Sequence, residues 1–126
     1  LVAPALGAGR HVVSDRSVYS TLAYQGYGRG LPLDDVRHIN EWAVAGHWPD
    51  LVVLLDVPLE VMMQRLKKRE LDRFELEDDG FHRRVRDGFS AMAAADPDRW
   101  VVIDGQQSKD AVQTAIRNAV AERLGL

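Results

Sequence analysis

Three short, nearly continuous apolar segments constrain the fold of this chain more than any other feature. They are residues 11–14 (HVVS), 51–55 (LVVLL) and 100–103 (WVVI). Branched aliphatic runs without polar alternation are typical of strands buried on both faces of a parallel sheet. Apolar residues at helical spacing separate the three segments. This order of strand, helices, strand, helices, strand and helix predicts an α/β fold with right-handed crossovers.

The segments between the predicted strands carry helix signals. One helix is predicted from Leu33 to about Ala45, with Asp34 and Asp35 in its first turn, and another begins near Pro58. Two later helices show apolar stripes at three- and four-residue spacing: Phe81, Val85, Phe89 and Met92, then Val112, Ile116 and Val120. We expect these apolar side chains, and also Tyr19, Trp42, Trp48 and Trp100, to serve packing rather than chemistry.

Composition excludes several classes of protein. A length of 126 residues predicts a single domain over residues 1–126. The net charge of −3 argues against a strongly basic nucleic-acid domain, and no apolar run approaches the roughly 20 residues that span a membrane. The chain has no cysteine, which excludes disulfides, thiol catalysis and cysteine–zinc sites. We therefore expect a cytoplasmic protein with neither nucleic acid nor membrane as a partner.

Each predicted strand is followed by an aspartate, namely Asp15, Asp56 or Asp104. Ligands of open parallel sheets bind outside the carboxyl ends of the strands, and Mg²⁺ prefers oxygen ligands. Helix capping and loop structure are the alternative roles of such aspartates, and we favour them for Asp56 and Asp104. For Asp15 we favour a function, because Arg16 follows directly and a guanidinium can hold a phosphate through two hydrogen bonds.

The segment after this Asp-Arg pair reads DRSVYSTLAYQGYGRGL over residues 15–31. If residues 16–25 are helical, one side of the helix carries polar and aromatic groups suited to a nucleotide base: Arg16, Ser20, Thr21, Tyr24 and Gln25. An amphipathic helix with a polar outer face would show the same pattern. The spacing alone leaves both interpretations open.

A second group of charges lies at residues 65–75, RLKKRELDRFE. Bases at a helix end that leads into a loop could close over a polyphosphate and stabilise a phosphoryl transition state. A solvated helix end with bases in its last turn is an equally good explanation.

Taken together, these segments resemble the bacterial thymidylate kinases. The resemblance rests on VVSDRSVYSTLAYQGYGRGL, PDLVVLLDVPLEV, RLKKRELDRFELE, FHRRVRDGF and DPDRWVVIDG, which appear in the family's order along the chain. It implies a three-layer P-loop NTPase fold of the nucleoside monophosphate kinase type, with a parallel sheet. It also implies transfer of the γ-phosphoryl group of ATP to dTMP with Mg²⁺, and a homodimer.

The resemblance assigns roles to residues that match the family's motifs. Arg16 would contact the dTMP phosphate, and Asp15 would support the phosphate–Mg²⁺ region, directly or through water. The thymidine pocket would be lined by Ser20, Thr21, Tyr24 and Gln25. A lid over about residues 65–79 would supply the catalytic bases Arg65, Lys67 and Arg69 and the element formed by Asp72, Arg73 and Glu75. Gly105 and Gln106 would border the ATP adenine.

Two departures from the family pattern matter. Ser17 stands where the family usually has Tyr or His, which makes a deoxynucleoside kinase the alternative. No GxxxxGK[ST] motif occurs among the 126 residues, so no loop of this type cradles the ATP phosphates. We expect an N-terminal truncation that removed the first strand and this loop, leaving these 126 residues inactive alone and poorly stable. A non-catalytic nucleotide-binding remnant remains a third interpretation.

Overall fold

The computed structural model describes residues 1–68 and 79–126, without the side chains of residues 66–68 and 79. Two strands are present in this part of the chain, β1 (Val52–Asp56) and β2 (Trp100–Asp104). The helices are α1 (Val2–Gly7), α2 (Val18–Thr21), α3 (Leu33–Val44), α4 (Leu59–Lys68), α5 (Asp79–Ala95) and α6 (Lys109–Leu124), with a π-helix η1 (Leu22–Gly28) directly after α2.

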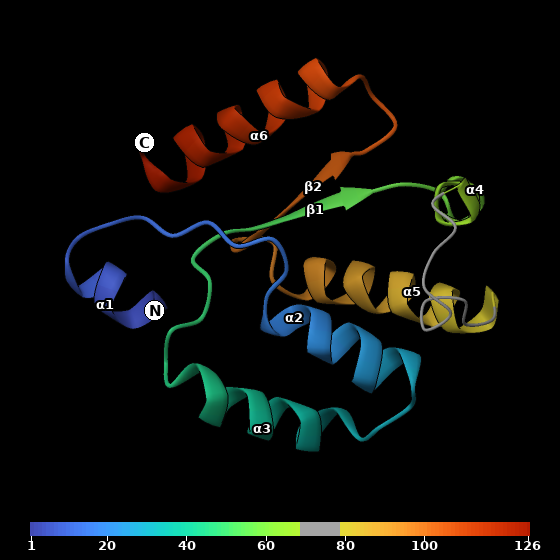
Figure 1. Ribbon diagram of the computed structural model, residues 1–126, viewed down its shortest axis with the longest axis horizontal. Helices are drawn as coiled ribbons and strands as arrows, with labels where there is room; N and C mark the ends of the chain where they lie inside the picture. The colour runs from blue at the N-terminus through green and yellow to red at the C-terminus, as the bar shows by residue number, and fades with distance from the viewer. Residues whose placement is uncertain (69–78) are drawn as a thin grey trace.

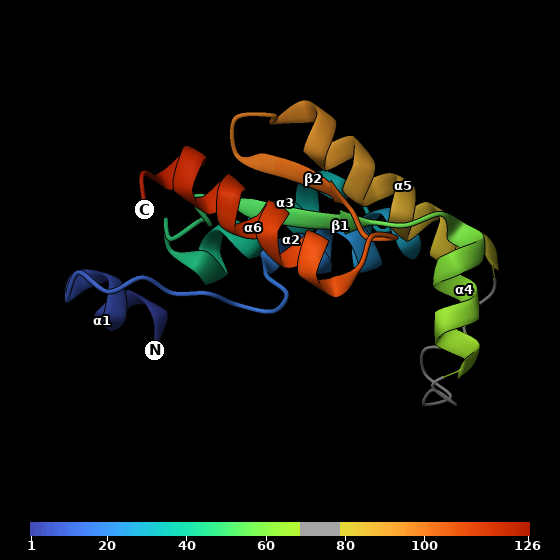
Figure 2. The ribbon, with the colours of Figure 1, turned by 90° about the horizontal axis from the view of Figure 1, so that it is seen from above.

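The two strands pair in parallel, with Val52 opposite Trp100 and Asp56 opposite Asp104. Helix α6 lies on one side of this sheet, whereas α5, the α2–η1 helix and α3 lie on the other (Figure 1). The parallel pair between helical layers confirms the predicted α/β fold. Helices α1 and α4 lie at opposite ends of the molecule (Figure 2). None of the described helices is long and apolar enough to cross a membrane.

The predicted strand over residues 11–14 is wrong. These residues have no regular secondary structure, and Val12 and Val13 are 41% and 97% exposed instead of buried. A strand needs a neighbour to satisfy its backbone N–H and C=O groups. Within the described residues β1 pairs only with β2, so residues 11–14 join no ladder.

The helix predicted over residues 16–25 is present in part, with a different geometry. It begins at Val18, where the Ser17 hydroxyl accepts a hydrogen bond from the Tyr19 N–H (3.3 Å). From Leu22 it widens into the π-helix η1, whose last turn includes a bond from the Arg29 N–H to the Tyr24 carbonyl (3.0 Å). Such wide turns are frequent at functional sites.

The core lies where α5, η1, α3 and β2 meet. Its buried members are Leu22, Ala23, Val36, Phe81, Val85, Met92, Ala93 and Trp100. The π-helix packs so closely on α5 that a Cβ at Gly28 would lie 2.8 Å from side-chain carbons of both Phe81 and Val85. The segment expected to bind a nucleotide is therefore fixed to the core.

Most of the aromatic residues pack as expected, but Trp42 does not. The Tyr19 ring centroid lies 5.6 Å from that of Trp48 and 4.9 Å from that of Trp100. In contrast, Trp42 is 85% exposed on α3, near Ile39 at 67%. These two residues lie on the outer side of α3, whose buried residues Val36 and Asn40 occupy the inner side.

We predict that a polypeptide of residues 1–126 alone will not unfold cooperatively. Beside Val13, the strand residues Leu55 and Val102 are 48% and 53% exposed, so the sheet leaves much apolar surface in water. The expected result is aggregation or a broad thermal transition followed by circular dichroism. A purified monomer with one sharp transition would contradict this prediction.

Candidate functional site

The aspartates at the ends of β1 and β2 serve local structure. The Asp56 carboxylate forms an ion pair with Arg86 (3.3 Å), and the Asp104 carboxylate accepts a hydrogen bond from the Gln106 N–H (2.9 Å). The Gly105 N–H donates to the Asp56 carbonyl oxygen at 2.7 Å and so ties the two strand ends together. These contacts agree with the structural roles favoured for Asp56 and Asp104.

The Asp15–Arg16 pair lies in the turn before α2, on exposed backbone. Arg16 has a φ of +75°, in the left-handed region that residues other than glycine rarely adopt. The Ser14 hydroxyl donates to the Arg16 carbonyl oxygen (2.7 Å) and so supports this conformation. Because strained backbone collects at ligand sites, this outlier marks the pair as a candidate functional position.

Arg16 and Tyr24 lie close together, although Arg16 lies in the turn before α2 and not within the helix predicted over residues 16–25. The Arg16 Cζ lies 5.5 Å from the centroid of the Tyr24 ring, within the range of a cation–π contact. The Tyr24 ring also packs against two aromatic residues of α5: its centroid lies 6.0 Å from that of Phe81 and 6.4 Å from that of Phe89. An exposed guanidinium is thus held against an aromatic ring that is itself supported by the core.

The remaining predicted acceptor residues lie on the same helix. Ser20 and Gln25 are half-buried, and Thr21 is exposed. Two surface hollows, of about 410 Å³ and about 300 Å³, are lined by other residues, chiefly of α5, β2 and the start of α4. The predicted acceptor residues line neither of these two hollows.

Arg65, predicted as a catalytic residue of the lid, contacts Gly105, predicted to border the ATP adenine. The Arg65 side chain, on α4, donates from Nη2 to the carbonyl oxygen of Gly105 (3.4 Å), although 40 residues separate them. Gly105 lies close to the β1 end, since a Cβ there would lie 2.9 Å from Val57. The predicted lid residues Arg69, Asp72, Arg73 and Glu75 lie outside the described residues. Lys67 lies in α4, but its side chain is not described.

The described residues offer Mg²⁺ a single carboxylate rather than a cluster of ligands. Among the described residues no group of three or more His, Asp or Glu side chains could hold a metal ion. Mg²⁺ is often bound by one or two carboxylates together with water and substrate phosphates. Asp15 suits that role, because its carboxylate forms no ion pair with another described residue and lies beside Arg16.

Sequence reasoning missed two arginines on α5. Arg86 donates from Nε to the Val57 carbonyl oxygen (2.9 Å) in addition to its ion pair with Asp56. Arg84 donates from Nε to the Gly28 carbonyl oxygen (2.9 Å), at the end of η1. Their partners lie 29 and 56 residues away along the chain, so the motif FHRRVRDGF gave no local signal for either contact.

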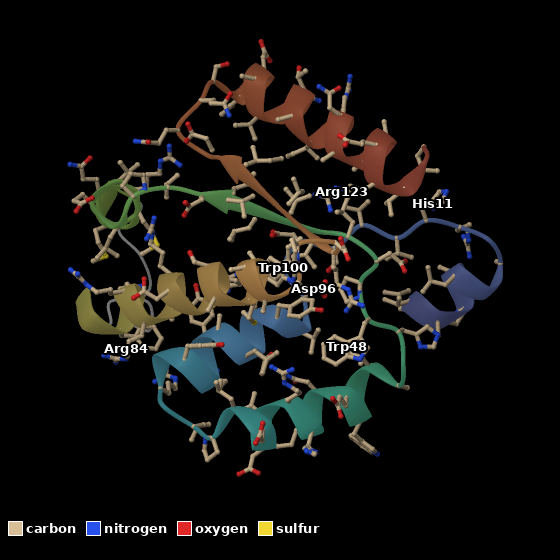
Figure 3. The ribbon with its side chains drawn as sticks, turned by 180° about the vertical axis from the view of Figure 1, so that it is seen from behind. His11, Trp48, Arg84, Asp96, Trp100 and Arg123 are labelled. Atoms are coloured by element: carbon tan, nitrogen blue, oxygen red, sulfur yellow. The ribbon has the colours of Figure 1, made fainter. Side chains whose placement is uncertain are left out.

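A third missed contact lies at the other end of α5. Arg99 donates to the Tyr19 hydroxyl (2.9 Å) and pairs with Asp96 (3.6 Å), close to Trp100 and Trp48 (Figure 3). The hydrogen bond with Tyr19 raises the pKa of Arg99 above its usual value. This cluster joins α2 to the start of β2 and has no predicted site residue in it.

Comparison with known proteins gives one consistent result. The family model described as thymidylate kinase matches residues 1–116. Thymidylate kinases of Neisseria gonorrhoeae and of a Synechococcus species are 47% and 50% identical to the chain over 126 residues. They match 99% and 100% of this chain, which spans 61% and 60% of their own lengths. A thymidylate kinase of Dehalococcoides mccartyi is 46% identical over the same length.

Proposed function

The chain belongs to the thymidylate kinase family, and we propose that the protein containing it transfers the γ-phosphoryl group of ATP to dTMP, giving dTDP and ADP. The chain spans about 61% of the length of the relatives it matches, so this activity is proposed for the whole gene product rather than for residues 1–126 alone. We further propose that the protein acts in the cytoplasm as a homodimer and needs no nucleic acid or membrane partner.

The contact between Arg16 and Tyr24 is the observation that carries this proposal. A guanidinium recognises a phosphate through paired charge-assisted hydrogen bonds, and its planar face is free to rest on an aromatic ring. With its Cζ 5.5 Å from the Tyr24 centroid, Arg16 is oriented while its N–H groups stay accessible. Ser20, Thr21 and Gln25 supply further hydrogen-bonding groups for the nucleoside on the same helix.

The donor side of the site rests on fewer contacts. Arg65 donates a hydrogen bond to Gly105 in the loop after β2, which supports placing these two residues in one site near ATP. Gln106 follows Gly105 in this loop and stays a proposed neighbour of the adenine. Asp15 would hold Mg²⁺, directly or through water, and the ion would neutralise charge on the transferred phosphoryl group. We keep Lys67, Arg69, Asp72, Arg73 and Glu75 as proposed lid residues on the strength of the resemblance.

Ser17 was the reason to consider a deoxynucleoside kinase, and the structure gives it another role. Its hydroxyl caps α2 through the Tyr19 N–H, which explains a serine at this position without reference to the acceptor. If Arg16 binds the acceptor phosphate as proposed, the acceptor is a nucleotide rather than a nucleoside.

Calorimetric titration of the gene product with dTMP and with thymidine tests the acceptor class. Because Arg16 is expected to bind the phosphate, dTMP should bind at least about 10-fold more tightly than thymidine, which corresponds to about 1.4 kcal/mol. Equal affinities, or tighter binding of thymidine, would contradict the proposal and favour the nucleoside kinase. The Arg16→Ala variant serves as the control, since it should bind both ligands with similar affinity.

A further inference from the structure

The end of the π-helix η1 is closed by a side chain from another helix. Within η1 and the turn that follows, the Tyr24, Gln25 and Gly26 carbonyls accept from backbone N–H groups of residues 29, 31 and 30. The Gly28 carbonyl instead accepts from the Nε of Arg84 on α5, at 2.9 Å. In Figure 3, Arg84 lies on α5 beside the end of the α2–η1 helix. Carbonyls at a helix end need such partners.

The surfaces of η1 and α5 interlock around this bond. Gly28 of η1 leaves room for Phe81 and Val85 of α5, because a Cβ at Gly28 would approach each to 2.8 Å. Gly88 of α5 leaves room for Tyr27 of η1, whose ring carbon a Cβ would approach to 2.5 Å. These contacts bring the two helices close together, and the Arg84 bond adds a directional contact between α5 and the end of η1.

The position of η1 sets the position of the proposed acceptor residues. Tyr24 and Gln25 belong to η1, and Arg16 contacts the Tyr24 ring. The Tyr24 ring in turn packs against Phe81 and Phe89, which lie on α5 on either side of Arg84 in sequence. A shift of η1 along α5 would therefore move the Tyr24 ring and the guanidinium that rests on it.

We propose that Arg84 is a positioning residue for the acceptor site: its bond to the Gly28 carbonyl holds η1 in the register that places Tyr24, and through it Arg16, for dTMP. This inference rests on the proposed function. Arg84 itself does not touch the substrate in this account.

Two substitutions in the gene product separate the hydrogen bond from the charge. Arg84→Met keeps a long side chain without a donor, whereas Arg84→Gln keeps an N–H donor at the position of Nε and removes the charge. Arg117→Met, at an exposed arginine of α6, is the control for loss of charge. For each variant we would measure the Kd of dTMP by calorimetry, the KM of ATP, and hydrogen exchange at the amides of residues 26–31.

The expected result is a Kd for dTMP that rises about 5-fold in Arg84→Met, the factor expected for one ordinary hydrogen bond, with faster exchange at residues 26–31. Arg84→Gln and Arg117→Met should stay within about 2-fold of the wild type for dTMP, as should the KM of ATP in all variants. A merely structural role would lower the melting temperature without this selective loss of dTMP affinity.

Three outcomes would overturn the inference, and one of them would also overturn the proposed function. If the wild type binds dTMP and Arg84→Met binds it equally well, the role of Arg84 fails and the proposed function stands. If Arg84→Gln is as weak as Arg84→Met, charge rather than the hydrogen bond matters and the register argument fails. If the wild type does not bind dTMP at all, the proposed function fails together with the inference.

Discussion

Replacing Arg16 with alanine should lower kcat/KM for dTMP at least about 100-fold. The guanidinium is expected to make two charge-assisted hydrogen bonds to the phosphate, each stabilising by about 1.5–3 kcal/mol, so their loss is worth at least about 3 kcal/mol. A lysine keeps the charge but not the planar fork or its stacking on Tyr24. In steady-state assays with varied dTMP, the kcat/KM of Arg16→Lys should therefore lie between that of the wild type and that of Arg16→Ala.

The control for this variant is Arg37→Ala, which removes an exposed arginine on α3 and should leave kcat/KM for dTMP unchanged. The KM of ATP should stay close to that of the wild type in Arg16→Ala, because Arg16 is assigned to the acceptor. A value of kcat/KM for dTMP within about 3-fold of the wild type would remove Arg16 from the phosphate site.

Replacing Gly88 with alanine should destabilise the fold by about 1–3 kcal/mol, the usual cost of overpacking. In an ordinary helix position, glycine to alanine would stabilise by about 0.5–1 kcal/mol. Here the new Cβ would lie 2.5 Å from the Tyr27 Cγ and 2.7 Å from its Cβ, and backbone-proximal atoms cannot rotate away. The two effects change the free energy of unfolding in opposite directions, so urea unfolding of the gene product distinguishes them.

The matched control is Gly7→Ala in α1, where an added Cβ meets nothing within 4 Å. That variant should be at least as stable as the wild type, because the added Cβ meets no other atom. If Gly88→Ala proved as stable as Gly7→Ala, the close packing of η1 on α5 would not hold in solution.

Local patterns predicted most of the helices and two strands, because the periodicity of apolar residues reports directly on a buried face. The stripe of Phe81, Val85 and Phe89 lies within α5, and helix α3 ends one residue before the predicted end at Ala45. The strand at residues 11–14 could not be settled in this way. Strand formation depends on a partner elsewhere in the chain, which the segment's own composition does not reveal.

The site was predictable in its residue types but not in its geometry. The spacing of Arg16 and Tyr24 predicted that they lie on one side of an α-helix. They do meet, but Arg16 lies in the turn before the helix, which becomes a π-helix from Leu22. The π-helix packs at Gly28 against Phe81 and Val85 of α5, more than 50 residues further along the chain, so its surroundings are not visible in the local sequence. For the same reason the bond between Arg84 and Gly28 had no signal in the sequence.

The most direct test of the account is transfer of label from [γ-³²P]ATP by the gene product, with dTMP or thymidine as acceptor and identification of the product. We predict labelled dTDP that forms only when dTMP is present, and no labelled dTMP from thymidine. Label in dTMP formed from thymidine would contradict the account in favour of a deoxynucleoside kinase. No transfer to either acceptor would contradict catalysis altogether and favour a nucleotide-binding remnant.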